Sequence, residues 1–442
     1  MAERRHARSA DTTFMDIYID LLRRNINYRN LWLGAVVSQL GDWFNLIAAA
    51  SLIADLTSSG VAISYLFLAR FLPLFIFSPF AGVLADRFDR RRILIASDLL
   101  RALIVLGFLL IRDPAHIWFF YLLTTTQFAL SAVFIPARTA VIANIVKRDD
   151  LVTANALDSF TWSTMLAIGA LLGGLVAAFL GNDTAFVVDA MTFLLAAWFI
   201  SRVHVPAQLA SERAEVSRGG WFDFVDGLRY LRGEPFILAI ALVKGGGSLV
   251  WGAINVLEVN FAEQIFPLGG DGSATLGIIY AITGIGTGFG PILLRRWLGD
   301  ESGRLRWAIT IGFWVLAIGI LGLSAAPTFA WFGVATLLRT VGSGTVWVFS
   351  AALLQMVVPD RFRGRVFAFE FALLTLTQSI SIWWAGYAQD YLDWTIREVT
   401  AGAGLTGLIV GLLWLLFHLR TLSRPLELAV RQPQPPETRH IL

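Results

Sequence analysis

Long apolar runs bounded by charged or turn-forming residues recur along the whole chain. There are twelve of them, and each approaches or exceeds the roughly 20 apolar residues that a bilayer-spanning helix needs. The predicted helices cover residues 31–56, 61–85, 93–111, 117–146, 151–180, 184–203, 236–261, 274–294, 307–325, 328–358, 365–388 and 396–419. The pattern therefore predicts an all-α membrane protein with twelve transmembrane helices.

The composition supports this interpretation. Hydrophobic residues make up 56% of the 442 residues and charged residues only 15%, whereas soluble domains have about 45–50% apolar and about 25% charged residues. The 39 glycines and 16 tryptophans suit helix contacts in lipid and aromatic belts. A soluble enzyme, a disordered chain and a small disulfide scaffold are excluded. Because the chain has no cysteine, thiol catalysis and Cys-ligated metals are excluded too.

The distribution of positive charge predicts the orientation. If the N-terminus is cytoplasmic, 28 of the 35 Lys and Arg residues fall in cytoplasmic segments. The positive-inside rule then places both termini in the cytoplasm. We expect a multi-pass protein of the plasma or inner membrane.

The longest break between the predicted helices, residues 204–235, follows the sixth of the twelve. It divides the chain into two pseudo-symmetric six-helix bundles, 31–203 and 236–420, as in a duplicated transporter. A cytoplasmic segment, 1–30, precedes them, and a proline-containing tail, 421–442, is expected to be disordered.

The central loop contains apolar residues at helical spacing. They predict a short amphipathic helix, either on the inner membrane surface or packed beneath the bundle: Trp221, Phe224, Val225, Leu228 and Leu231.

A weak internal repeat relates the two halves. Residues 146–158 align with 358–370, and both segments leave one helix, cross a charged turn and enter the next. The alignment places Asp158 and Glu370 at equivalent positions of the fifth and eleventh helices.

The turn between the second and third predicted helices carries the most specific motif. Residues 82–92 read GVLADRFDRRR, which resembles the signature loop of the major facilitator superfamily, G-x-x-x-D-R-x-G-R-R. Asp89 stands where the family has its second glycine. The resemblance implies a latch that holds the cytoplasmic side shut in the outward-open state, formed by Gly82, Asp86, Arg87, Arg90 and Arg91. Positive-inside anchoring is the alternative, and it would explain the arginines alone.

A glycine motif in the fifth helix also resembles this superfamily. Residues 169–174, GALLGG, are similar to the exporter motif G-P-x-x-G-G, with Ala170 in place of the proline. Gly169, Gly173 and Gly174 would equally let helices meet tightly in any bundle.

Four longer segments, 29–44, 134–146, 155–193 and 358–366, are similar to the macrolide and enterobactin exporter branch of the drug:proton antiporters. The resemblance implies a secondary transporter, not an enzyme, that exports a lipophilic or amphipathic small molecule in exchange for protons. We expect a monomer that contacts membrane lipids and has no nucleic-acid partner. One departure concerns the fourth helix, where TTTQF (124–128) stands in place of the R-x-x-Q-G of many proton-linked exporters.

Ionisable residues inside the predicted helices are candidates for coupling, because each costs about 2.5–3.5 kcal/mol near the bilayer centre. Proton antiport needs a buried carboxylate that takes up a proton outside and releases it inside. The candidates, in descending order, are Asp42, Asp158 and Glu370.

Buried ion pairs that hold the helix register are the alternative use of such charges. Possible partners inside the helices are Arg70, Asp98, Arg101, Arg138 and Lys244. Asp42 and Arg70 are expected at similar depth, and Asp98 and Arg101 share one helix face. Asp189 and Glu258 are placed toward the outer ends of their helices. Arg339 is then left without a partner at its depth, which makes it a candidate for contacting an anionic group of the cargo.

Aromatic residues within the helices predict an apolar cavity wall suited to an amphipathic cargo. The substrate-binding candidates besides Arg339 are Trp43, Phe71, Trp162, Trp251 and Trp347. Further aromatic residues within the helices are Phe44, Phe67, Phe128, Phe371 and Trp383. We expect about two thirds of all these rings to face lipid or pack between helices, and the sequence alone does not distinguish which.

Other mechanisms find little support in the sequence. No G-x-x-x-x-G-K-[ST] loop occurs, and the five histidines lack the spacing of metal ligands, so we expect no cofactor and no metal. Two other functions stay open: a lipid or lysolipid flippase of the same fold, and a membrane sensor or scaffold that does not transport.

Overall fold

The computed structural model describes residues 14–57, 59–147, 150–205, 228–268, 272–298 and 302–421. Within these ranges, twelve helical segments are long and apolar enough to cross a membrane. The predicted all-α architecture and its number of spans are therefore confirmed. One further helix, α2 (Phe14–Arg24), precedes the first span.

The first half of the chain contributes six spans. They are α3 (Ile26–Thr57), α4 (Gly60–Arg87), α5 (Arg90–Gly107), α6 (Ile117–Ile145), a fifth span made of α7 (Leu151–Thr164), the π-helical turn η4 (Met165–Gly169) and α8 (Ala170–Leu180), and α9 (Asn182–Ser201).

The second half contributes the other six. They are α11 (Pro235–Asn260) with its π-helical continuation η6 (Phe261–Ile265), α12 (Ser273–Leu298), α13 (Ser302–Ser324), α14 (Phe329–Val357), α15 (Asp360–Tyr391) and α16 (Ile396–Arg420).

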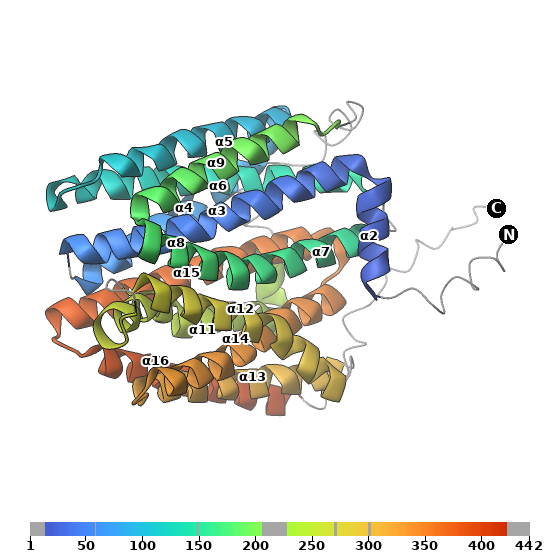
Figure 1. The fold of residues 1–442 in the computed structure, drawn as a ribbon. Helices are drawn as coiled ribbons and strands as arrows, with labels where there is room; N and C mark the ends of the chain where they lie inside the picture. The colour runs from blue at the N-terminus through green and yellow to red at the C-terminus, as the bar shows by residue number, and fades with distance from the viewer. Residues whose placement is uncertain are drawn as a thin grey trace, which may run out of the picture.

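The two halves form separate bundles that lie side by side, the first in blue to green and the second in yellow to red (Figure 1). Helix pairs correspond between them: α4 packs on α6 as α12 packs on α14, and α5 packs on α9 as α13 packs on α16. The bundles meet chiefly where α4 contacts α15 and where α8 contacts α12. These two interfaces are also equivalent under the same correspondence, so the whole molecule is pseudo-symmetric.

Because the number of spans is even, α3 begins and α16 ends at the same end of the bundle, next to α2 (Figure 1). We call this the terminal end and the opposite one the far end. By the positive-inside prediction, the terminal end is the cytoplasmic one.

Local sequence explains where several helices begin. Asp89, the residue that departs from the signature loop, is the N-cap of α5, and its Oδ1 accepts a hydrogen bond from the Arg92 amide at 2.8 Å. Thr395 and Glu398 form a capping box at the start of α16. Gly181 separates the fifth and sixth spans with a positive φ of 85°, a conformation that glycine adopts without steric cost.

At the far end, the two bundles are joined by one carboxylate. Asp390, near the end of α15, accepts hydrogen bonds from the Ser59 hydroxyl at 2.5 Å and from the amides of Gly60 and Val61 at 3.1 Å each. These groups form the N-terminus of α4, where a helix favours negative charge. The far end of the α4–α15 interface is therefore closed.

Parts of three predictions fall outside the described residues. These parts are residues 1–13, the apolar positions Trp221, Phe224 and Val225 of the central loop, and the tail from 422 onward. The described end of that loop is helical over 228–233, and Leu231 within it is fully buried. This burial agrees with a loop helix packed beneath the bundle.

Candidate functional site

A buried group of charged side chains lies in the first bundle, on α3, α4, α5 and α9. Asp98 and Arg101 form an ion pair at 2.5 Å, three residues apart on α5, and both are almost completely buried. The Arg101 guanidinium also lies 4.3 Å from the ring centre of Phe134 and 4.6 Å from that of Phe193. Aromatic faces and a carboxylate together compensate a cation that has left water.

Asp42 and Arg70 belong to the same group, but they do not form the predicted ion pair. Nη1 of Arg70 instead donates a hydrogen bond to Oδ1 of Asn45 at 3.3 Å, and its guanidinium lies 4.4 Å from the ring centre of Phe128. Asp42 interacts electrostatically with both Arg70 and Arg101. The prediction was wrong because Asn45, one turn along α3 from Asp42, takes the contact with the arginine.

A third carboxylate completes this group. Asp189 on α9, predicted to lie toward the outer end of its helix, is fully buried against Gly41, beside Asp42. A Cβ at Gly41 would lie 2.4 Å from Oδ1 of Asp189 and 1.9 Å from the Thr192 hydroxyl. The contact of α3 with α9 at this glycine therefore brings the two carboxylates together. Among the described residues, Oδ2 of Asp189 has no hydrogen-bond partner.

We call Asp42, Arg70, Asp98, Arg101 and Asp189 the charge cluster. Three carboxylates share two guanidinium groups, so the cluster has one negative charge in excess when all five are ionised. Asp98 and Asp189 are fully buried, whereas Asp42 is partly accessible. Asp42 is therefore the most accessible of the three carboxylates of the cluster.

The other two coupling candidates are held in ion pairs nearer the terminal end. Arg138 on α6 donates both guanidinium nitrogens to the carboxylate of Asp158, each at 2.9 Å, and the Tyr28 hydroxyl donates to Asp158 at 3.5 Å. Nζ of Lys244 on α11 lies 3.1 Å from Oε2 of Glu370 on α15. The repeat-equivalent carboxylates thus both have cationic partners, but from helices that do not correspond.

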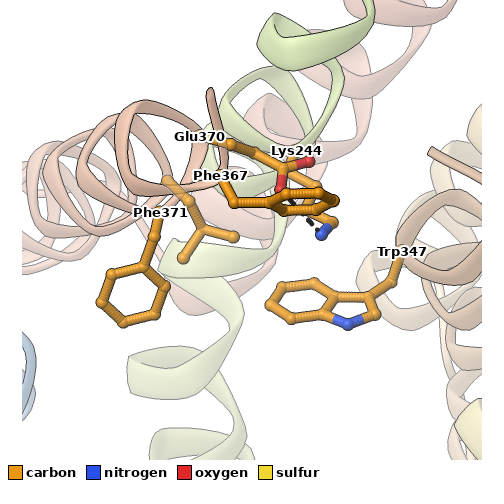
Figure 2. A pocket seen from close by; sticks show the side chains of 6 residues that line it. Lys244, Trp347, Phe367, Glu370 and Phe371 are labelled. Atoms are coloured by element: carbon orange, nitrogen blue, oxygen red, sulfur yellow. Dashed lines mark hydrogen bonds and ion pairs between the residues drawn. The ribbon is translucent and has the colours of Figure 1, made fainter. Parts of the chain in front are cut away.

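The Lys244–Glu370 pair lines a cavity of about 260 Å³ in the second bundle. Figure 2 shows the pair with the ring of Phe367 beside it and with Trp347 and Phe371 flanking the space next to it. Nζ of Lys244 lies 4.6 Å from the ring centre of Trp347. The cavity therefore combines one cation, one anion and apolar aromatic walls.

Arg339 is not left without a partner, as the sequence analysis expected, so the reason for assigning it to an anionic group of the cargo is lost. Its guanidinium donates a hydrogen bond to Oε1 of Glu258 and another to the Thr283 hydroxyl at 3.2 Å. The sequence pattern ends the seventh helix near Phe261, whereas η6 continues it to Ile265. The longer helix places Glu258 deeper in the bundle, within reach of Arg339.

The predicted cytoplasmic latch can be described only in part. The side chains of Gly82, Asp86 and Arg87 lie outside the described residues. Arg91 donates a hydrogen bond to the backbone carbonyl of Ser201 at the end of α9. This contact lies within the first bundle, so it anchors α5 to α9.

The glycine motif of the fifth span permits close helix contacts, two of them with α3 in the first bundle and one with α12 across the bundle interface. A Cβ at Gly173 would lie 3.0 Å from the Cα of Phe44, and one at Gly174 would lie 2.7 Å from the Ser273 carbonyl oxygen on α12. At Gly169, the nearest atom is Cδ1 of Trp43, at 3.1 Å. These contacts support the alternative that the three glycines let helices pack tightly.

The aromatic candidates lie in different environments. Trp347 lines the cavity, and its ring centre lies 6.3 Å from that of Trp251. The ring of Trp43 contacts Tyr280 of the other bundle. Phe44 and Phe67, from the wider set, are buried in helix packing, whereas Trp162 is half-exposed and Phe71 partly buried.

Some residues of these sites were named from the sequence only as charges inside apolar runs: Asp189, and Lys244 as a possible ion-pair partner. Asn45, Phe367 and Tyr280 were not selected at all, since nothing in their neighbourhood along the chain distinguishes them from other residues of a membrane helix.

Comparison with known proteins agrees with the fold. The family model "Major Facilitator Superfamily" matches residues 31–369. The chain is 25% identical over 355 residues to "Putative bacilysin exporter BacE" of Bacillus subtilis (strain 168), covering 80% of this chain and 86% of that protein. It is 26% identical over 420 residues to the uncharacterized MFS-type transporter y4rN of Sinorhizobium fredii, covering 91% and 98%.

Solved structures share the architecture. The nucleoside transporter NupG superposes with a TM-score of 0.71 at 11% identity, over 88% of this chain and 99% of that one. A bacterial homolog of the human lysosomal transporter Spinster, inward-facing and unoccupied, gives a TM-score of 0.70 at 11% identity, over 90% and 98%. At such identities these similarities concern the fold alone.

Proposed function

Because this chain belongs to the Major Facilitator Superfamily, and so is a multi-pass membrane transporter, we propose that it exports an amphipathic small molecule from the cytoplasm in exchange for protons. The two bundles would rock about a central site to expose it alternately to the two sides. Similarity to a protein named as an exporter supports the direction. The finer resemblance to macrolide and enterobactin exporters, and the placement in the plasma or inner membrane, stay predictions.

The excess carboxylate of the charge cluster is the observation that carries proton coupling. An uncompensated charge far from water is costly, whereas one bound proton makes the five groups neutral overall. Asp42 is the proposed proton carrier, because Asp98 is paired with Arg101 and both Asp98 and Asp189 are fully buried. Asp158 and Glu370 rank below it, since each has a direct cationic partner.

The charge cluster also has a route to the second bundle. Arg70 interacts electrostatically with Asp42 and with Tyr280 of α12, and Trp43, next to Asp42, packs on the same tyrosine. Loss of the negative charge at Asp42 would therefore change the forces across the bundle interface. Such a change is what coupling requires, because a proton shifts an equilibrium only if it binds the two states differently.

Closure of the far end supports uptake of cargo from the cytoplasm. Asp390 joins α15 to α4 there through hydrogen bonds from the Ser59 hydroxyl and from the amides of Gly60 and Val61. If the terminal end is cytoplasmic, this conformation is one in which a cytoplasmic cargo could enter.

The test is transport into inside-out vesicles, whose lumen corresponds to the outside of the cell. With an acidic lumen, we expect wild-type vesicles to accumulate ethidium or another member of an amphipathic panel that includes a fluorescent lysolipid. Asp42→Asn should abolish gradient-driven accumulation but keep exchange without a gradient, since its side chain resembles the protonated form. Asp183→Asn is the matched control, because it disrupts only an exposed ion pair with Arg112.

Three other outcomes of the transport test would change the proposal. Full gradient-driven accumulation by Asp42→Asn would contradict Asp42 as the proton carrier. Movement of the lysolipid alone would favour the flippase alternative. Absence of any movement across the panel, with normal expression, would contradict export and favour a sensor or scaffold.

A further inference from the structure

We propose that the cavity at Lys244 and Glu370 binds the α-amino-acid head group of an amphipathic zwitterion. The carboxylate of the cargo would bind the Lys244 ammonium, its own ammonium would bind the Glu370 carboxylate, and its apolar part would lie against the aromatic walls. The inference rests on the proposed export function and names the class of cargo.

The two charges have the spacing that such a head group requires. Nζ of Lys244 and Oε2 of Glu370 lie 3.1 Å apart. In an α-amino acid, the ammonium nitrogen and a carboxylate oxygen are also roughly 3 Å apart, because a single carbon joins the two groups. The head group can therefore lie against the pair with each of its charges next to the opposite charge of the protein.

Both protein groups have unused hydrogen-bonding capacity. Oε1 of Glu370 has no hydrogen-bond partner among the described residues. The whole side chain is only 3% exposed, so water does not satisfy this oxygen either. A lysine ammonium has three donors, and the contacts of Lys244 within the described chain are Glu370 and the face of Trp347. A buried acceptor without a partner is unusual, and the ammonium group of a cargo would satisfy it once the side chains that cover Oε1 move aside.

The electrostatic balance favours a zwitterion over a singly charged molecule. A lipophilic cation bound at Glu370 would compete with Lys244 and leave the lysine in an apolar cavity with an uncompensated charge. An anion bound at Lys244 would do the same to Glu370. A zwitterion adds one charge of each sign and keeps the cavity neutral.

The remaining walls fit a small apolar group. Trp347, Phe367, Phe371 and Leu374 line the rest of the cavity. Its volume of about 260 Å³ is close to the lower end of the roughly 300–1,000 Å³ typical of small-molecule sites. An aromatic amino acid or a similarly small derivative is the cargo that this volume admits.

Four probes of similar size distinguish the contributions of the two head-group charges to binding. Tryptophan is the zwitterion, tryptophanamide the cation, N-acetyltryptophan the anion and N-acetyltryptophanamide the neutral form. Binding to the purified full-length protein is measured by titration calorimetry. We expect tryptophan to bind about ten-fold more tightly than either singly charged probe, since each charged hydrogen bond lost is worth about this factor.

Variants of the pair assign each charge of the probe to its partner. In Lys244→Met, amidation of the probe should no longer weaken binding, and in Glu370→Gln, acetylation should no longer weaken it. The double variant Lys244→Met with Glu370→Leu should prefer the neutral probe. This double variant keeps the test available if a single variant misfolds, because replacement of both partners of a buried pair is often tolerated. Arg112→Gln, which disrupts an exposed ion pair, is the control and should bind all four probes as the wild type does.

Three results would overturn the inference: no binding of tryptophan, equal binding of the four probes, or a charge preference that persists unchanged in the double variant. In that last case the pair would serve only to join α11 to α15. If tryptophan fails to bind but ethidium is exported in a gradient-dependent and Asp42-dependent manner, the inference is wrong and the proposed function stands. If tryptophan binds as predicted but no compound is transported in a gradient-driven manner, the inference stands and the proposed function is wrong.

Discussion

The indole of Trp43 packs against the ring of Tyr280, with ring centres 5.5 Å apart and planes inclined at 50°. Trp43 lies on α3 of the first bundle and Tyr280 on α12 of the second, so this contact crosses the interface that must change during alternating access. Tyr280 is 4% exposed, and its hydroxyl has no hydrogen-bond partner among the described residues. The contact thus stabilises the conformation observed here through packing.

Trp43→Ala should therefore shift the population toward conformations that are open at the far end. An aromatic pair contributes about 0.5–1.5 kcal/mol beyond its buried area, which corresponds to a change of about 2- to 12-fold in the ratio of the two states. Because the chain has no cysteine, spin labels at Asp113→Cys and Ala325→Cys would report the separation of the bundles by pulsed electron resonance. Trp297→Ala, at a highly exposed tryptophan, is the control, and an unchanged distance distribution in Trp43→Ala would contradict the prediction.

Asp390→Ala should loosen the far end by a different route. It removes the acceptor for the Ser59 hydroxyl and for the amides of Gly60 and Val61. Since hydrogen bonds to a charged group contribute about 1.5–3 kcal/mol each, amide exchange at the start of α4 should become at least about ten-fold faster. Mass spectrometry of peptides covering Gly60 and Val61 measures this. Asp20→Ala on the exposed face of α2 should leave the rate unchanged, and equal protection in both variants would argue against the role of Asp390.

Gly41→Ala should destabilise the first bundle. The added Cβ would lie 1.9 Å from the Thr192 hydroxyl and 2.4 Å from Asp189, so α3 and α9 would have to separate. Overpacking of this kind costs about 1–3 kcal/mol and should lower the thermal midpoint in detergent. At Gly303 a Cβ would meet nothing within 4 Å, so Gly303→Ala should be neutral or slightly stabilising. Similar midpoints for the two variants would show that α9 can move away from Gly41 freely.

Glu258→Gln should destabilise the second bundle strongly, because it leaves Arg339 with a buried and uncompensated charge. Removal of one partner of a buried pair costs about 3–5 kcal/mol, whereas replacement of both by apolar residues of similar volume is often neutral. The double variant Arg339→Met with Glu258→Leu should therefore unfold close to the wild-type temperature. A double variant as unstable as the single one would mean that packing around these side chains, not charge, determines the loss.

The number and position of the spans could be predicted from the sequence because lipid imposes a local requirement. A segment in the bilayer must satisfy its own backbone hydrogen bonds and must be apolar over about 20 residues. Both properties can be counted along the chain, so the predicted edges agree with the helices to within a few residues at most ends. The agreement failed at the seventh helix, which continues as η6 beyond its predicted end. The expected depth of Glu258 was therefore wrong as well.

The partners of the buried charges could not be predicted in the same way. Asp98 and Arg101 share one helix, so their spacing of three residues was sufficient to place them together. Asp42, Asp189 and Arg70 lie on three different helices, and their proximity depends on the rotation of each helix and on the small residue Gly41 between two of them. Only the tertiary structure decides those rotations, because they result from side-chain packing across helices that the linear sequence does not order.

The same distinction separates the cavity from the fold. The sequence by itself determined a twelve-span transporter with aromatic residues and several charges inside its helices, since composition and local spacing are sufficient for that. The tertiary structure alone decided that Lys244, Glu370 and Trp347 meet around one space, because they come from three helices, and Lys244 lies more than one hundred residues before the other two along the chain. Their meeting depends on how the helices rotate and tilt against one another, and no local property of the chain encodes it.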